Sequence, residues 1–177
     1  MSSSANTLNE PLLGSCFCGS IGYSLTSEPL LSAYCHCTNC QRLSGCPFVH
    51  TVHFPASQFS WIIPDYSPPS SPTFSPSPHS EPKHLSLLDT YSIPNRPHKT
   101  RFRCKNCGAC VASYNSLKDT FSIWGAHLSR DGQGKIERWE VVKPSAHIFY
   151  GTRMVEVRDG LGKWEGYEGR SEKLDLE

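Results

Sequence analysis

Nine cysteines constrain this 177-residue chain more than any other feature of its sequence. Seven of them form three groups, namely Cys16 and Cys18 (C-x-C), Cys35, Cys37 and Cys40 (C-x-C-x2-C), and Cys104 and Cys107 (C-x2-C). Cysteines one residue apart rarely bridge each other without strain, and an odd number cannot pair completely within one chain. The pattern therefore favours metal binding in a reducing compartment over a disulfide framework.

Two of the groups complement each other as a closed metal site. The pair Cys104 and Cys107, followed by Gly108, is typical of a zinc knuckle and supplies two thiolates. A structural zinc takes four ligands, and Cys16 and Cys18 are the natural complement because the remaining group already forms a local set. We therefore predict a structural zinc site made of all four residues, which would pin the first strand to a hairpin far downstream.

The remaining group, Cys35, Cys37 and Cys40, predicts a second zinc site with three protein ligands. Three ligands with one exchangeable position are typical of catalytic zinc. One alternative is that Cys46 or a neighbouring histidine closes the site, and another is that the group consists of buried or redox-active thiols. Cys46 and Cys110 themselves are expected to be core thiols.

Other polar residues near these groups are weaker candidates. His36 lies between two predicted ligands and should point away from the metal if the segment is extended, although a role in proton transfer is an alternative. Arg42 is a candidate for anion binding or an ordinary surface residue. The basic run over residues 98–105 is interpreted as a solvated strand edge, because the net charge of only +1 does not favour nucleic-acid binding. Four further histidines in strand-like contexts are expected to be structural, namely His50, His53, His127 and His147.

Local patterns predict a mostly β fold. Short β-branched and aromatic runs are separated by turns, and no long amphipathic helix is evident. Thr38–Leu43 is predicted to form one helical turn with Thr38 as its N-cap. Strands are predicted within residues 14–27, 30–35, 47–54, 119–128 and 145–151, a hairpin over residues 100–114, a turn over residues 131–134, and further ordered chain over residues 83–93.

The composition divides the chain into segments. Residues 1–13 resemble a disordered lead without signal-peptide features, and residues 168–177 a polar tail. Residues 14–167 are predicted to form one zinc-binding domain. Within it, residues 64–82 contain 7 prolines and 6 serines among 19 residues, which predicts a flexible insertion, with a Pro-rich docking motif as the alternative. No apolar run is long enough to span a membrane.

Several motifs together resemble the glutathione-dependent formaldehyde-activating enzyme family, which includes centromere protein V-like proteins. They are "GSCFCGSIGYSL", "YCHCTNCQRLSGCPF", "RFRCKNCGA", "HIFY" and "VRDGLGKWEGY", and they extend from about Gly14 to Tyr167. The resemblance implies a β-tent fold of small antiparallel sheets organised around a structural zinc. It assigns Cys16, Cys18, Cys104 and Cys107 to that zinc, and Cys35, Cys37 and Cys40 to a second, catalytic-type zinc. The chain departs from the family at Cys46, where a small residue is usual, and at Cys110, where a small or apolar residue is usual.

The activity that the resemblance implies is addition of glutathione to formaldehyde, classed as a carbon–sulfur lyase reaction. We therefore expect an enzyme with two zinc ions that binds glutathione or a related thiol at Cys35, Cys37 and Cys40. It would add the thiol to, or remove it from, an aldehyde or similar small electrophile. Attack of an activated water on a carbonyl is the alternative chemistry. The expected partners are small molecules rather than membranes or nucleic acids, and the expected location is the cytoplasm, with the nucleus also consistent.

A different class of function is also open. Both zinc ions could be structural, and the protein would then be a non-catalytic binding module. The Pro/Ser-rich segment or the basic strand would recruit a protein or chromatin partner. A chromatin role would favour a strongly basic patch, which the sequence does not show beyond residues 98–105.

Overall fold

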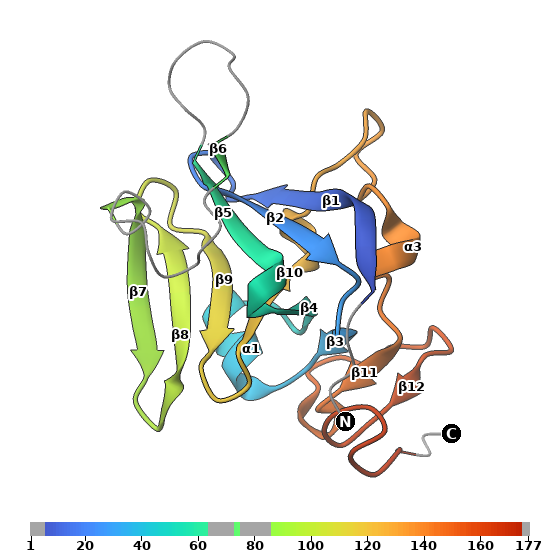
Figure 1. The fold of residues 1–177 in the computed structure, drawn as a ribbon. Helices are drawn as coiled ribbons and strands as arrows, with labels where there is room; N and C mark the ends of the chain where they lie inside the picture. Colours follow the sequence, from blue (N-terminus) through green and yellow to red (C-terminus); the bar gives the residue numbers. More distant parts are fainter. Residues whose placement is uncertain (1–5, 64–72, 75–85, 175–177) are drawn as a thin grey trace.

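The structure is a computed structural model that describes residues 6–63, 73–74 and 86–174. It contains two β-sheets, and the prediction of a mostly β fold is confirmed (Figure 1). The small sheet has the order β1-β2-β5-β6. Its strands are β1 (Thr7–Ser15), β2 (Gly22–Ser27), β5 (Phe59–Ile63) and β6 (Thr73–Phe74). The predicted insertion over residues 64–82 lies outside the described residues except for β6.

The large sheet has eight strands in the order β12-β11-β3-β4-β10-β9-β8-β7. They are β3 (Leu31–Cys35), β4 (Val49–Pro55), β7 (Leu88–Ile93), β8 (Arg96–Cys104), β9 (Cys110–Asn115), β10 (Thr120–Trp124), β11 (Ala146–Ile148) and β12 (Gly162–Lys163). The sheets are mostly antiparallel, as expected, and the exception is at one edge, where β11 pairs in parallel with both β3 and β12. A parallel pair needs a long crossover, and here the chain between β3 and β11 includes most of the domain.

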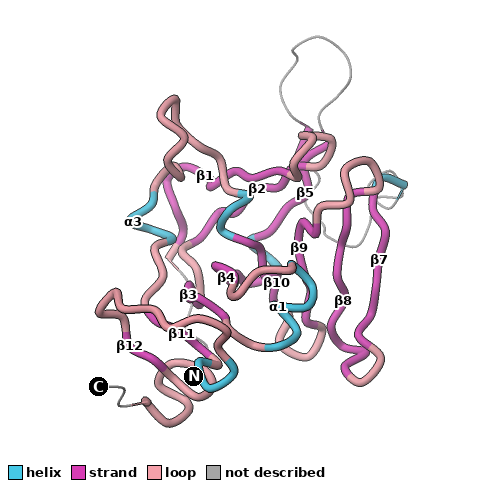
Figure 2. The backbone as a smooth tube through the Cα atoms, turned by 180° about the vertical axis from the view of Figure 1, so that it is seen from behind, coloured by secondary structure: helices cyan, strands magenta, loops and turns pink. Residues whose placement is uncertain are grey.

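Helical structure is short and lies in the connections (Figure 2). The elements are α1 (Thr38–Ser44), α3 (Trp139–Val142) and the 3₁₀ turns η1 (Ala56–Gln58), η2 (Gly125–His127) and η3 (Tyr150–Thr152). The predicted helical turn is confirmed as α1, but the predicted N-cap is wrong. The N-cap is Cys37, whose sulfur accepts a hydrogen bond from the Cys40 backbone N–H at 3.4 Å. None of the described helices is long and apolar enough to cross a membrane.

The core lies between the two sheets because their strands alternate apolar and polar residues. Phe59 of β5 stacks on Phe121 of β10 with ring centroids 4.0 Å apart. Tyr23 of β2 stacks on Phe59 from the other side, and all three side chains are fully buried or nearly so. The strands twist and pack face to face, as expected for a two-layer β fold. The opposite face of the large sheet therefore remains available for polar side chains.

The predicted disordered lead over residues 1–13 is wrong from Thr7 onward. This segment forms β1, which pairs with β2 and inserts Leu12 into the core at 3% exposure. Apolar and polar residues do not alternate regularly in the first half of this segment, which also contains Pro11. The sequence pattern therefore did not predict this strand, which is stabilised by its pairing with β2. At the other end, Leu174 donates a backbone hydrogen bond to Lys163, so the predicted polar tail packs back on β12 as far as it is described.

A glycine is required at position 14, where the backbone of β1 packs against the ring of Tyr23. Gly14 is paired with Tyr23, and a Cβ at this position would overlap the ring, which is fully buried and has no room to move. We predict that Gly14→Ala lowers the free energy of unfolding by about 1–3 kcal/mol, the usual cost of overpacking. Urea denaturation measures it. Gly132→Ala is the matched control, since no atom lies within 4 Å of its added Cβ, and an equal loss in both variants would contradict the explanation.

Candidate metal centres and ligand cavity

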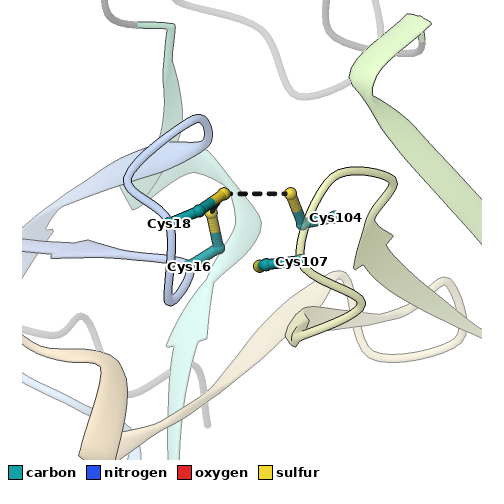
Figure 3. Close-up of side chains that lie close together, drawn as sticks. All are labelled: Cys16, Cys18, Cys104 and Cys107. Atoms are coloured by element: carbon teal, nitrogen blue, oxygen red, sulfur yellow. Dashed lines mark hydrogen bonds between the residues drawn. The ribbon is translucent and has the colours of Figure 1, made fainter.

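Two turns that are far apart in the sequence bring four cysteine sulfurs together. Cys16 and Cys18 follow β1, while Cys104 ends β8 and Cys107 lies in the turn between β8 and β9 (Figure 3). All four sulfurs lie within 4.8 Å of one another. This is the group that the sequence predicted as the structural zinc site, and it joins the small sheet to the large one.

The geometry of this group fits a tetrahedral zinc. Four sulfurs at about 2.3 Å from a central ion lie about 3.8 Å from one another. The sulfur of Cys18 lies 3.6 Å from that of Cys16 and 3.8 Å from that of Cys104. The Ile21 backbone N–H donates to the Cys16 sulfur at 3.4 Å, as is common around metal-bound thiolates. The donor set is therefore suited to a closed zinc site.

Glycine makes both turns tight enough for this arrangement. Gly19 and Gly108 follow the second cysteine of each pair, and both have positive φ, at 76° and 75°. Their backbone N–H groups donate to the carbonyls of Cys16 and Cys104, respectively. A side chain at either position would be strained, because L-residues other than glycine disfavour this region. The two turns thus present their thiols in the same way.

The second predicted group also comes together. Cys35 ends β3, Cys37 caps α1 and Cys40 lies in its first turn, and their three sulfurs lie within 4.8 Å of one another. Hydrogen bonds with Cys35 and Cys40 lower the pKa of Cys37, whereas hydrogen bonds with Cys37 and Cys40 raise the pKa of Cys35. A cluster that stabilises a thiolate in this way is suited to holding a soft or borderline-soft cation.

No fourth ligand completes this second group within the described part of the chain. No further His, Cys, Asp or Glu joins the three sulfurs. Cys46 is exposed and its thiol contacts the Ser44 carbonyl, so it does not close the site, and its expected place in the core is wrong. Cys110 is half-buried, and burial raises its pKa to about 11, as expected for a structural thiol. Both line a second cavity of about 1080 Å³ on the other side of α1.

The three-cysteine group lines a cavity of about 310 Å³, which we call the thiol cavity. Its floor is the polar face of the large sheet, formed by Thr51, His53, Ser113 and Ser122. Phe149 and Tyr167 form part of its wall, with their rings in an edge-to-face contact. By contrast, the four-cysteine group lines neither this cavity nor the one beside Cys46 and Cys110. In the described part of the chain, the second group therefore lines a cavity that a small molecule can enter.

His36 lies behind the three-cysteine loop rather than in the cavity. It is completely buried, and its Nε2 lies 2.8 Å from Nδ1 of His147. Nε2 of His147 lies 2.8 Å from the carboxylate of Asp159. Because the carboxylate accepts, His147 carries its proton on Nε2 and accepts from His36. Burial lowers the pKa of His36 to about 4, so this ring is neutral, and the hydrogen-bonded pair of rings holds the loop from behind.

The loop is fixed by further hydrogen bonds to the His36 backbone. Its carbonyl accepts from the Gln41 amide at 2.7 Å and from the Thr152 hydroxyl at 3.0 Å. Its N–H donates to the Ile148 carbonyl. Arg42, the sequence candidate for anion binding, is exposed on α1 and does not line the thiol cavity. His36 is therefore not positioned to transfer a proton in the thiol cavity, and Arg42 is not positioned to bind an anion there.

The cationic residues of the cavity were missed because the basic run was interpreted as a solvated edge. That interpretation is wrong, since β8 lies between β7 and β9. Thr100 and Phe102 alternate with Lys99 and Arg101, and the two cations line the thiol cavity. The alternation of side chains between the two faces of a strand could have predicted that Lys99 and Arg101 lie on one face together. Arg96 and Lys118 line the same cavity, as does Glu165.

The N-terminal third of the chain is similar to a known protein family. The model of the glutathione-dependent formaldehyde-activating enzyme family matches residues 11–67. The family resemblance is confirmed. The matched segment includes the first two cysteine groups but not Cys104 and Cys107. A crystal structure of a Rhodobacter sphaeroides protein shares 16% identity with a TM-score of 0.43, covering 70% of this chain and 96% of that one. No curated protein matches the chain significantly.

The two cysteine groups are expected to respond differently to substitution. We predict that Cys37→Ser lowers the bound zinc from two ions to one while the protein stays folded, because this group supports a cavity. We predict that Cys104→Ser strongly lowers the melting temperature, because metal binding there contributes folding free energy. Native mass spectrometry and thermal unfolding measure both effects, and Cys46→Ser is the control that should keep two ions. Unfolding of the Cys37→Ser variant would instead make the second group structural.

The buried histidine pair provides a separate prediction. Asp159→Ala leaves the Nε2–H of His147 without its acceptor in a fully buried ring. We predict a loss of about 1–3 kcal/mol in the free energy of unfolding, the cost of an unsatisfied buried donor. We also expect weaker metal binding at Cys35, Cys37 and Cys40, measured by competition with a chelator. Glu172→Ala, which removes an exposed carboxylate, should change neither quantity.

Proposed function

We propose that this protein is a zinc-dependent enzyme of the carbon–sulfur lyase type. It binds glutathione or a related small thiol at Cys35, Cys37 and Cys40 and adds it to, or removes it from, an aldehyde or similar electrophile. The observation that carries the proposal is that three convergent thiols line a cavity, with no fourth protein ligand among the described residues. The family match supports the same chemistry.

The residues present fit a zinc ion with one exchangeable position. Zinc in such a site lowers the pKa of a thiol that occupies the free position. The chain itself supplies Cys35 from the end of β3 and Cys37 and Cys40 from α1, so two elements fix the three sulfurs. The buried pair of His36 and His147 holds the loop, and the sheet floor confines the reactants. Binding both molecules in one small cavity supplies proximity and orientation.

The reaction balances without a further reactant. In the forward direction the thiol sulfur forms a bond to the carbonyl carbon, the carbonyl π bond breaks, and its oxygen takes the thiol proton. The product is a hemithioacetal, and the reverse direction releases the thiol and the aldehyde. No redox change occurs, so no nicotinamide or flavin is needed. None of the nine cysteines, all of which lie among the described residues, forms a disulfide, which is consistent with our proposal of a reducing, cytoplasmic environment.

The proposal is tested by native mass spectrometry of the zinc-loaded protein with and without glutathione. We expect two zinc ions and one glutathione per chain, with the glutathione adduct lost in the Cys37→Ser variant. An aldehyde screen, monitored by NMR detection of the hemithioacetal, then identifies the electrophile. Retention of two zinc ions without any thiol adduct or turnover would contradict the proposal and favour a non-catalytic binding module.

A further inference from the structure

The thiol cavity has a cationic wall built by the register of the large sheet. Lys99 of β8 pairs with Asn115 of β9, which pairs with Thr120 of β10. The next row on the same face runs from Arg101 through Ser113 and Ser122 to His53. Residues two apart on a strand lie on the same face, so both rows point away from the core. Lys99 and Arg101 therefore lie on the same face of the sheet as the hydroxyl, amide and imidazole groups that line the cavity.

Four cations share this cavity, and none is paired with a carboxylate among the described residues. Lys99 and Arg101 are half-buried, while Arg96 and Lys118 are exposed at the rim. None of them forms a salt bridge with the described residues, although Lys118 lies 5.1 Å from the centre of the Tyr167 ring. Burial, and then the charges of Arg101 and Arg96, lower the pKa of Lys99. Clustered cations that are partly desolvated and unpaired are unfavourable unless an anion binds them.

The thiol cluster does not supply enough negative charge to balance this wall. Lys99 and Arg101 line the same cavity as Cys37 and Cys40, so the cations and the thiol group share one space. Three thiolates around a divalent ion carry a net charge of about −1. Glu165 is the one acidic side chain among the lining residues, and its carboxylate packs against Gly151, where a Cβ would overlap it. An excess of positive charge remains for a ligand.

We propose that Lys99 and Arg101, assisted by Arg96 and Lys118, form an anion-binding subsite for two carboxylates of the thiol substrate. Glu165 faces the ammonium group of the same molecule. This inference rests on the proposed function and deepens it by naming the groups that select the thiol. Charge-assisted hydrogen bonds to carboxylates are stronger than neutral ones, so a neutral thiol loses most of this recognition.

The size of the cavity agrees with this class of ligand. At about 310 Å³ it lies at the lower end of the range for small-molecule sites, which suits a tripeptide-sized thiol. A thiol joined to a nucleotide would be too large to enclose and offers phosphates but no ammonium group. The subsite therefore selects small thiols that carry two carboxylates and one amine.

The test uses S-methylglutathione, which keeps both carboxylates but cannot bind a metal as a thiolate. Titration calorimetry on the zinc-loaded full chain should show binding that weakens as salt is raised. The diethyl ester of the same compound should bind about tenfold more weakly or worse, because both carboxylates are neutral. Lys99→Gln should lower the affinity for S-methylglutathione by a similar factor and leave the affinity for the ester unchanged. Lys118→Gln, at an exposed position, should produce a smaller loss.

The control is Lys135→Gln, which removes an exposed cation away from the cavity and should leave both affinities unchanged. Equal affinities for S-methylglutathione and its ester, or an unchanged affinity in Lys99→Gln, would overturn the subsite. Binding of succinate without binding of S-methylglutathione would place the anionic group on the electrophile and also overturn it. If the subsite is confirmed but glutathione forms no Cys37-dependent adduct, the proposed function fails alone. If the adduct forms without the subsite, this inference fails alone.

Discussion

The central strands of the large sheet have to satisfy two different surfaces at once. On one face they present Phe102, Phe121 and other apolar residues to the small sheet, and that contact forms the core. On the other face the same strands present hydroxyls, amides and cations to a cavity. A shift of one residue in the register of β8, β9 or β10 would exchange these surfaces and bury the cations in the core. The position of the cavity thus depends on the same pairing that makes the fold stable.

The cysteine spacing made it possible to predict which sulfurs cluster. Metal coordination demands several donors within a few ångströms, and short C-x-C and C-x2-C turns meet that demand locally. The pairing of Cys16 and Cys18 with Cys104 and Cys107 is non-local, yet elimination was sufficient because the third group is complete in itself. The strands followed from β-branched and aromatic runs, and β3, β4 and the hairpin of β8 and β9 form where they were predicted.

The residues around the cysteines were predicted poorly because their roles depend on the direction in which each side chain points. His36 and Arg42 lie next to predicted ligands in sequence, but one points into the protein interior and the other to solvent. Lys99 and Arg101 are remote from Cys37 in sequence and become its neighbours only when β8 joins the sheet. The parallel pairing of β11 with β3, which brings His147 behind His36, likewise depends on a crossover that no local pattern specifies. Sequence proximity therefore identified well which cysteines come together, and identified the groups around them poorly.

The helix α1 contains no buried residue, and its first turn is capped by a cysteine sulfur. It separates the thiol cavity from the cavity that contains Cys46 and Cys110. Any metal that binds Cys37 and Cys40 consequently organises the partition between the two cavities. Occupation of the metal centre and the shape of the cavity are then thermodynamically coupled. By reciprocity, a ligand that requires the ordered helix must tighten metal binding by the same factor by which the metal tightens binding of that ligand.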